Sequence, residues 1–333
     1  MKVVAILFVI ILHVVEHIGC QRSNFEVAYG CRFIKSISVS CINLFALATG
    51  FLCINSKCRY SRLVKLWVSA VFWGLIMLVI CKFCLELDTP IIFYFHAAFP
   101  VMYNQYWFFT AYFLLFLMIP FLNSGVRNMS IAQFRHLFIA IAIFICGYSC
   151  WGCGDRFVMH YGYSFAWLCV VYVVGAFIRL HFTAKINSGR CFQLTVLIAF
   201  FSGFSMPSTN YASGIGIPCF YTSPFTLAIS LLIFLGCLNL RFSEKVAKFL
   251  KVVSATTFGI YLIHVQPFVW VNVWLYYLRQ VKVESILGLI FAVFSLSFIV
   301  FVALVIAEHA RIKLFERMGI ERLTAKVDRI LPR

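Results

Sequence analysis

Four ionisable residues lie in the apolar segment that opens the chain, and their spacing places them along one side of a helix. The segment reads KVVAILFVIILHVVEH and contains Lys2, His13, Glu16 and His17. Eleven helical steps of about 100° bring His13 to within about 20° of the direction of Lys2, and about 16 Å further along the axis. Glu16 and His17 follow His13 by three and four residues, the spacing at which helical side chains meet.

This cluster has the residue types of a general base. A carboxylate beside a histidine fixes the tautomer of the ring and stabilises the imidazolium that forms when the ring takes a proton. Ionisable groups are costly to bury within an apolar segment, so a functional site is the default hypothesis. The alternative is a polar cluster at the outer mouth that caps a helix or pairs with another span.

The composition indicates that the helix carrying these residues crosses a membrane. Of the 333 residues, 63% are hydrophobic and 12% are charged, and the mean hydropathy is +0.96. A soluble domain carries about 25% charged residues. Apolar stretches of about 20 residues recur along the chain, and each is long enough to cross a bilayer core of about 30 Å. Lys2 is then expected at the membrane rim and His13 near mid-membrane.

We therefore predict an all-α fold, a polytopic helical bundle of about ten transmembrane helices. Residues 1–310 are expected to form one transmembrane domain, and residues 311–333 a basic cytoplasmic tail. The segment 85–104 is predicted to be re-entrant or interfacial. The expected spans are roughly 3–19, 35–54, 63–83, 105–123, 137–153, 161–179, 192–207, 219–240, 254–277 and 285–307.

The basic residues predict the orientation. The net charge is +17, and if the N-terminus is cytoplasmic, roughly three quarters of the Lys and Arg residues fall in cytoplasmic connections and the tail. This bias predicts that both termini are cytoplasmic and that the number of spans is even. Because these charges sit in short connections, we expect contact with anionic membrane lipids and no nucleic-acid partner.

The cysteines indicate neither a metal site nor a redox framework. The chain has 14 Cys, scattered and often inside apolar runs, where a free thiol behaves as a small hydrophobe. No zinc-ligand spacing occurs, and no metal is expected. A disulfide between Cys20 and Cys31 would join two loop residues, but the sequence offers no further support for it.

Five segments resemble, in order, those of the acyltransferase-3 family of membrane acyltransferases. The family's first span carries Arg, ten residues and then His, and here Lys2 and His13 hold these places. LFALATGFL, with Thr49-Gly50-Phe51, is similar to the Ser-Gly-Phe ending of the family's second span. The other matches are the basic loop KCRYSRLVK with Arg59 and Arg62, the span YWFFTAYFLLFLMIPFL from Trp107 to Pro120, and FGIYLIHVQPF with Tyr261 and His264.

The resemblance covers nearly the whole chain and implies an enzyme of the bacterial inner (cytoplasmic) membrane. It implies an O-acyltransferase, and more specifically an O-acetyltransferase, because members of the family O-acetylate envelope glycans. The donor would be acetyl-CoA or a similar acyl-CoA, used as a co-substrate and approached from the cytoplasm. The acceptor would be a hydroxyl of a lipid-linked or periplasmic glycan, such as O-antigen, capsule or exopolysaccharide.

Within that resemblance the candidate residues take roles. His13 removes the proton of the acceptor hydroxyl and Glu16 orients it; an acyl-histidine intermediate is the competing role for His13. The acyl-CoA would be bound by three basic residues at the rim, Lys2, Arg59 and Arg62. The alternative for the two arginines is that they serve only to set the orientation of the protein in the membrane. The acceptor site would be lined by His17, Tyr261, His264 and Trp107. The alternative roles are bundle packing for Tyr261 and His264 and a place in an aromatic belt for Trp107.

Two other functions share the many spans and buried polar residues. One is a transporter or flippase for a glycan or a lipid-linked intermediate, although no internal repeat is visible, as transporters often show. The other is an inactive scaffold in envelope synthesis, which the replacement of the family arginine by Lys2 keeps open.

Overall fold

The chain is mainly helical in the part that the computed structural model describes, residues 1–18, 24–57, 59–147, 159–182, 186–205 and 220–330. No strand occurs among these residues. The α-helices are α1 Lys2–His17, α2 Phe25–Ser38, α3 Cys41–Cys53, α4 Tyr60–Cys84, α5 Ile91–Ala98, α6 Trp107–Asn128, α7 Ile131–Ala140, α9 Phe165–His181, α10 Ser188–Ser205, α11 Pro224–Leu238, α12 Glu244–His264, α13 Pro267–Val269, α14 Leu275–Leu278, α15 Ile286–Arg317, α16 Ile320–Ala325 and α17 Val327–Ile330.

Five helical segments in the described residues are long and apolar enough to cross a membrane: Phe25–Cys53, Tyr60–Cys84, Trp107–Asn128, Glu244–His264 and Ile286–Arg317. Shorter apolar helices, among them Phe165–His181 and Pro224–Leu238, pack beside them. The all-α membrane architecture is thus confirmed. The number of ten spans and the cytoplasmic placement of both termini stay predictions.

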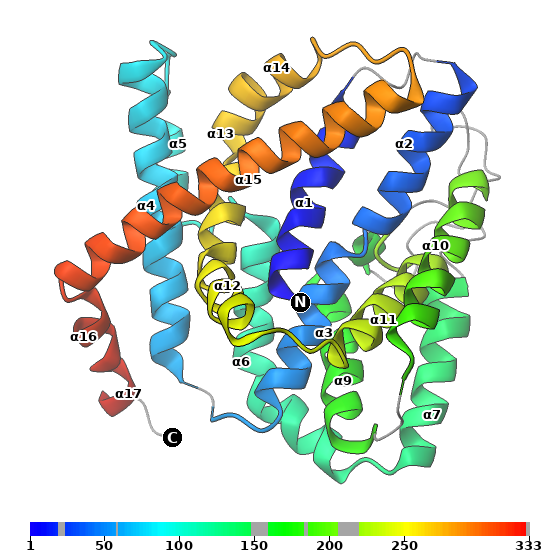
Figure 1. Ribbon diagram of the computed structural model, residues 1–333. Coiled ribbons are helices and arrows are strands. Elements are labelled where there is room, and N and C mark those ends of the chain that lie inside the picture. Colours follow the sequence, from blue (N-terminus) through cyan, green and yellow to red (C-terminus); the bar gives the residue numbers. More distant parts are fainter. Residues whose placement is uncertain (19–23, 58, 148–158, 183–185, 206–219, 331–333) are drawn as a thin grey trace.

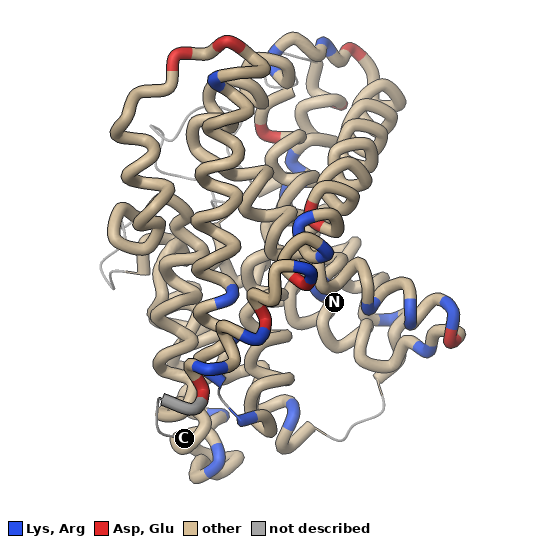
Figure 2. Tube along the Cα trace, turned by 90° about the vertical axis from the view of Figure 1, so that its left-hand side faces the viewer, with Lys and Arg blue, Asp and Glu red and all other residues tan. Residues whose placement is uncertain are grey.

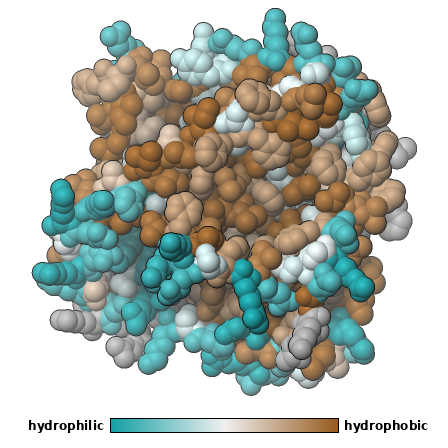
Figure 3. All heavy atoms as spheres, in the orientation of Figure 1, coloured by the Kyte–Doolittle hydropathy of each residue, from teal (hydrophilic) through white to brown (hydrophobic). Residues whose placement is uncertain are grey.

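The surface is divided into an apolar zone and polar ends. Figure 3 shows hydrophobic residues covering most of the upper part of the molecule, with hydrophilic residues gathered below and a thinner row along the top edge. In Figure 2 most of the Lys and Arg residues lie in the lower half. Phe291 and Phe298 of α15 are 77% and 66% exposed, as expected for side chains that face lipid.

Helix α1 lies inside the bundle, where α2, α3, α12 and α15 all pack against it (Figure 1). Its residues Ala5, Ile6 and Ile10 are fully buried. A helix that is apolar on nearly all sides must be covered by other helices or by lipid, and α1 is covered by helices. The residues on α1 are therefore held in the centre of the protein.

Two glycines let α3 and α9 pack closely. A side-chain carbon added at Gly50 would overlap the backbone of Tyr172, and one added at Gly175 would overlap the backbone of Leu47. Small residues at helix contacts are how membrane helices approach each other, because lipid gives no hydrophobic drive for their association. The Thr49-Gly50-Phe51 segment thus has a packing role in this contact.

The second span differs from its predicted bounds of 35–54. Helix begins at Phe25, and the chain passes through Val39 and Ser40 between α2 and α3. Hydroxyls in this stretch bond to nearby carbonyls, Ser38 to that of Ile34 and Ser40 to that of Ile37. Serine side chains that bond to the backbone in this way compete with regular helix, and we attribute the break to them.

The later segments also differ in extent. α6 continues past Pro120 to Asn128, although a span end was expected near that proline. α15 continues to Arg317, so the expected boundary between residues 310 and 311 falls inside a helix. The segment 85–104 contains the short helix α5, which packs on α4 where Gly74 faces Ala97.

A buried ion pair joins α4, α12 and α15. Glu308 is 1% exposed and accepts two hydrogen bonds from Arg311, at 2.6 and 2.8 Å, and one from the indole nitrogen of Trp73, at 2.6 Å. Gly259 of α12 leaves the space in which the carboxylate lies. Both charged groups are satisfied, which is the condition for burying them. This contact fixes α12 between its two neighbours.

Candidate functional site

Two predicted site residues meet inside the bundle. Nδ1 of His13 on α1 lies 3.0 Å from Nε2 of His264, the last residue of α12. Their rings are stacked, with centroids 5.0 Å apart and planes inclined by 21°. One proton is shared at such a contact, because one nitrogen must donate and the other must accept. When His13 donates from Nδ1, its Nε2 is left as a base.

Access to His13 differs from access to its neighbours. Leu12 and Val14 are buried on both sides of it and His264 is 1% exposed, whereas His13 is half-buried. His13 as a residue is therefore more accessible than the residues that flank it on α1.

A short π-helical segment, Trp270–Trp274, covers the pair. The indole of Trp270 lies 4.6 Å from the ring of His13, 5.2 Å from that of His17 and 5.5 Å from that of His264, between centroids. Trp274 lies 5.5 Å from His264. π-Helical turns occur often at functional sites. This one begins after α13, whose first turn is capped by the side chain of Gln266.

Glu16 lies near His13, but its salt bridge is with another residue. Its carboxylate lies 2.8 Å from Nζ of Lys35 on α2, and both side chains are partly exposed. Glu16 follows His13 by three residues on α1, but no hydrogen bond between the two side chains is found among the described residues. The ring nitrogen contact that orients His13 comes from His264.

The predicted basic rim is located at the starts of helices. Lys2 opens α1, Arg59 is the residue before α4, and Arg62 lies in the first turn of α4; all three are exposed. The rim is thus separated from the histidine pair by most of the length of α1.

The remaining predicted residues have different surroundings. Tyr261 lies one turn before His264 on α12, and its ring is 5.5 Å from that of Phe108. Trp107 is half-buried and packs on Tyr163 and Tyr221, with centroids 4.7 and 5.9 Å away. Trp107 therefore belongs to an aromatic cluster, and among the described residues no ring contact joins Trp107 to His13.

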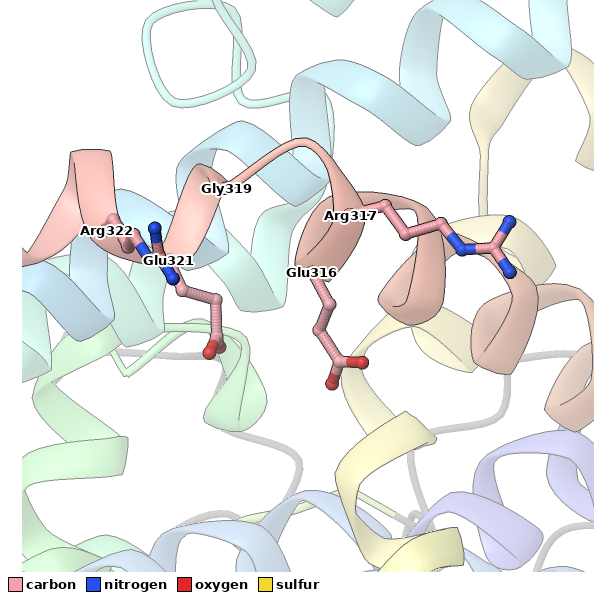
Figure 4. A pocket seen from close by; sticks show the side chains of 5 residues that line it. All are labelled: Glu316, Arg317, Gly319, Glu321 and Arg322. Carbon is pink, nitrogen blue, oxygen red and sulfur yellow. The ribbon is translucent and has the colours of Figure 1, made fainter.

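A surface hollow elsewhere does not involve any of these residues. It is lined by Glu316, Arg317, Gly319, Glu321 and Arg322, where α15 ends and α16 begins. Figure 4 shows the carboxylates of Glu316 and Glu321 pointing to the same side, whereas Arg317 points away from them. The mixed charge does not favour a polyanion. Within the described residues, no group of three His, Cys, Asp or Glu side chains is placed to hold a metal ion.

Sequence reasoning missed the two tryptophans beside the histidines. Trp270 and Trp274 are four residues apart after Pro267, a spacing that places them on one helical side, and this was the available signal. It also missed the pair of Glu308 and Arg311, although a lone acid in an apolar run with a base three residues later is visible in the sequence.

One comparison with known proteins gave a match. The model of a family described as an acyltransferase domain matches residues 1–308. No curated protein and no solved structure matches the chain. The match begins before Lys2 and ends at Glu308, so it spans α1, α12 and the histidine pair.

Proposed function

The chain belongs to this family of membrane acyltransferases, and from that premise we propose that it is an O-acyltransferase, an O-acetyltransferase in the simplest case. The donor is acyl-CoA from the cytoplasm. The acceptor is a hydroxyl of an envelope glycan, lipid-linked or periplasmic, such as O-antigen, capsule or exopolysaccharide. The protein works in the bacterial inner membrane, among anionic lipids.

The proposed orientation places the basic end of the molecule in the cytoplasm. The bias of Lys and Arg toward one end supports it. A second support is Cys31 on α2, which is disulfide-bonded, because disulfides persist on the oxidising side of the membrane. Cys31 lies within α2 and not in the predicted loop, and Cys20, for whose pairing with Cys31 the sequence offered no further support, lies outside the described residues. With this orientation α1 enters at Lys2 and carries His13 toward the outer side.

The contact between His13 and His264 is the observation that carries the proposed chemistry. His13 accepts the proton of the acceptor hydroxyl at Nε2, while its Nδ1 donates to Nε2 of His264. The hydroxyl oxygen attacks the thioester carbonyl carbon, the carbon–sulfur bond breaks, and the proton passes from His13 to the departing thiolate. His264 positions His13 through this contact.

The two substrates would meet this base from opposite sides. CoA has a polyanionic nucleotide end and a long thin arm. The basic rim of Lys2, Arg59 and Arg62 suits the nucleotide end, and the length of α1 suits the arm. On the outer side, His17 and the aromatic surface of Trp107 suit a sugar ring.

The test is CoA release by the purified protein in detergent with acetyl-CoA and a glycan acceptor. His13→Ala and His13→Gln are expected to lower the rate by about 100-fold or more, the usual contribution of a general base, while membrane insertion is kept. His136→Gln is the matched control, because His136 is exposed on α7. A wild-type protein that releases no CoA but moves the glycan would favour a transporter, and an unchanged rate in His13→Gln would remove His13 from the mechanism.

A further inference from the structure

Five buried polar atoms near the contact of α6, α12 and the π-helical segment have no hydrogen-bond partner among the described residues. They are the hydroxyls of Tyr106, Thr110 and Tyr261, Nδ1 of His264 and Nε1 of Trp274. Each unpaired buried group costs about 1–3 kcal/mol. Proteins rarely leave such groups together without a reason, and a ligand that is absent from the structure would satisfy them.

Two of these hydroxyls belong to neighbouring tyrosine rings. The rings of Tyr106 and Tyr261 have centroids 6.2 Å apart, and the residues are 1% and 5% exposed. The Tyr261 ring also packs on that of Phe108, in the first turn of α6, with centroids 5.5 Å apart. Amides in a first helical turn have no partner within the helix, and the helix dipole makes this end positive. Tyr106 is the residue before α6 and Tyr261 packs on its first turn, so both tyrosines lie at the end of the helix that stabilises negative charge.

The chemistry of these groups selects the ligand. Tyrosine hydroxyls, the Trp274 indole and backbone amides can all donate hydrogen bonds, and the indole and the amides cannot accept them. An oxygen that accepts two or more hydrogen bonds fits this environment, and a cation does not. Tyr261 and His264 are three residues apart on α12, the spacing at which helical side chains lie on one side, so Tyr261 is on the side of α12 that carries the histidine pair.

We propose that Tyr106 and Tyr261 bind the carbonyl oxygen of the acyl group and stabilise the negative charge that it gains during transfer. This rests on the proposed function. When the acceptor oxygen adds to the carbonyl carbon, the electron pair of the C=O bond moves to this oxygen, and the two hydroxyls donate to it. When the carbon–sulfur bond breaks, the pair returns to re-form C=O, and CoA leaves as the thiol with the proton from His13.

The test removes each hydroxyl and keeps the ring. Tyr106→Phe and Tyr261→Phe are expected to lower kcat by about 100-fold to 1,000-fold, the usual loss for one oxyanion donor, with little change in the KM for acyl-CoA. Their thermal midpoints without substrate are expected to stay or rise, because an unpaired buried hydroxyl is removed. The matched control is Tyr172→Phe. That hydroxyl donates to Asn123 at 2.7 Å, so its loss should lower the midpoint and leave kcat unchanged.

Each outcome decides the matter. If both variants keep the wild-type kcat while the wild-type protein releases CoA, the hydroxyls do not touch the reacting oxygen and the proposal falls alone. If Tyr261→Phe loses thermal stability as Tyr172→Phe does, its hydroxyl has a structural partner, which also overturns the proposal. A wild-type protein without CoA release overturns this proposal together with the proposed function.

Discussion

Replacing Gly259 by alanine should destabilise the protein, because the new methyl group would occupy the place of the Glu308 carboxylate. That carboxylate cannot move aside without losing its three hydrogen bonds from Arg311 and Trp73. Breaking a buried ion pair costs about 3–5 kcal/mol. The higher helix propensity of alanine offsets about 1 kcal/mol of this loss of stability. The net loss is therefore about 2–4 kcal/mol.

The assay measures the apparent thermal midpoint of the purified protein in detergent. The midpoint is the temperature at which half of the monodisperse peak in size-exclusion chromatography is lost. Gly259→Ala should lower the midpoint by several degrees. Gly125→Ala is the control, since Gly125 is also inside a helix, α6, and an added carbon there meets nothing within 4 Å. The control should be neutral or slightly stabilising.

A double-mutant cycle then isolates the contact. Glu308→Ala removes the group that the new methyl meets, so Gly259→Ala should cost almost nothing in that background. Equal costs of Gly259→Ala in both backgrounds would refute the reasoning, as would a Gly259→Ala protein as stable as Gly125→Ala.

Substitutions at three further positions test other parts of the protein. Lys2→Arg should keep activity, whereas Lys2→Glu should raise the KM for acyl-CoA in the CoA-release assay, because a negative charge at the rim repels the polyanionic nucleotide. His264→Gln should lower kcat by roughly 10-fold or more and leave the KM for acyl-CoA nearly unchanged, since His264 contacts His13 rather than the donor; a rise in KM alone would contradict this. Asn43→Ala should lower the thermal midpoint without changing kcat, because the Asn43 amide bonds to both the Trp167 indole, at 2.9 Å, and the Tyr221 carbonyl, at 3.0 Å.

The sequence was sufficient for the architecture because a membrane imposes a strong pattern. Composition and repeated apolar runs predicted an all-helical membrane protein, and the resemblance predicted the acyltransferase family that the comparison shows. The helix bounds were harder to predict. Serines that bond to local carbonyls broke one span into α2 and α3, and α6 continued through Pro120. Hydropathy averages over these local effects and does not detect them.

The partners within the site depend on contacts between distant helices, and these are absent from a single sequence. Spacing along α1 placed Glu16 beside His13, but only the packing of α2 shows that Glu16 forms a salt bridge with Lys35. Likewise, His264 was selected as an acceptor residue, and only the packing of α12 on α1 reveals its contact with His13. The roles of these residues in catalysis stay predictions until the variants are measured.

The histidine pair also constrains how the protein is made. His13 and His264 are 251 residues apart in the chain. At a synthesis rate of about 5–20 residues per second, roughly 12–50 s pass between the appearance of the two residues at the ribosome. During that interval α1 is present without α12, and the ring of His13 lacks this partner. A chain that ends before α12 would therefore lack the histidine pair.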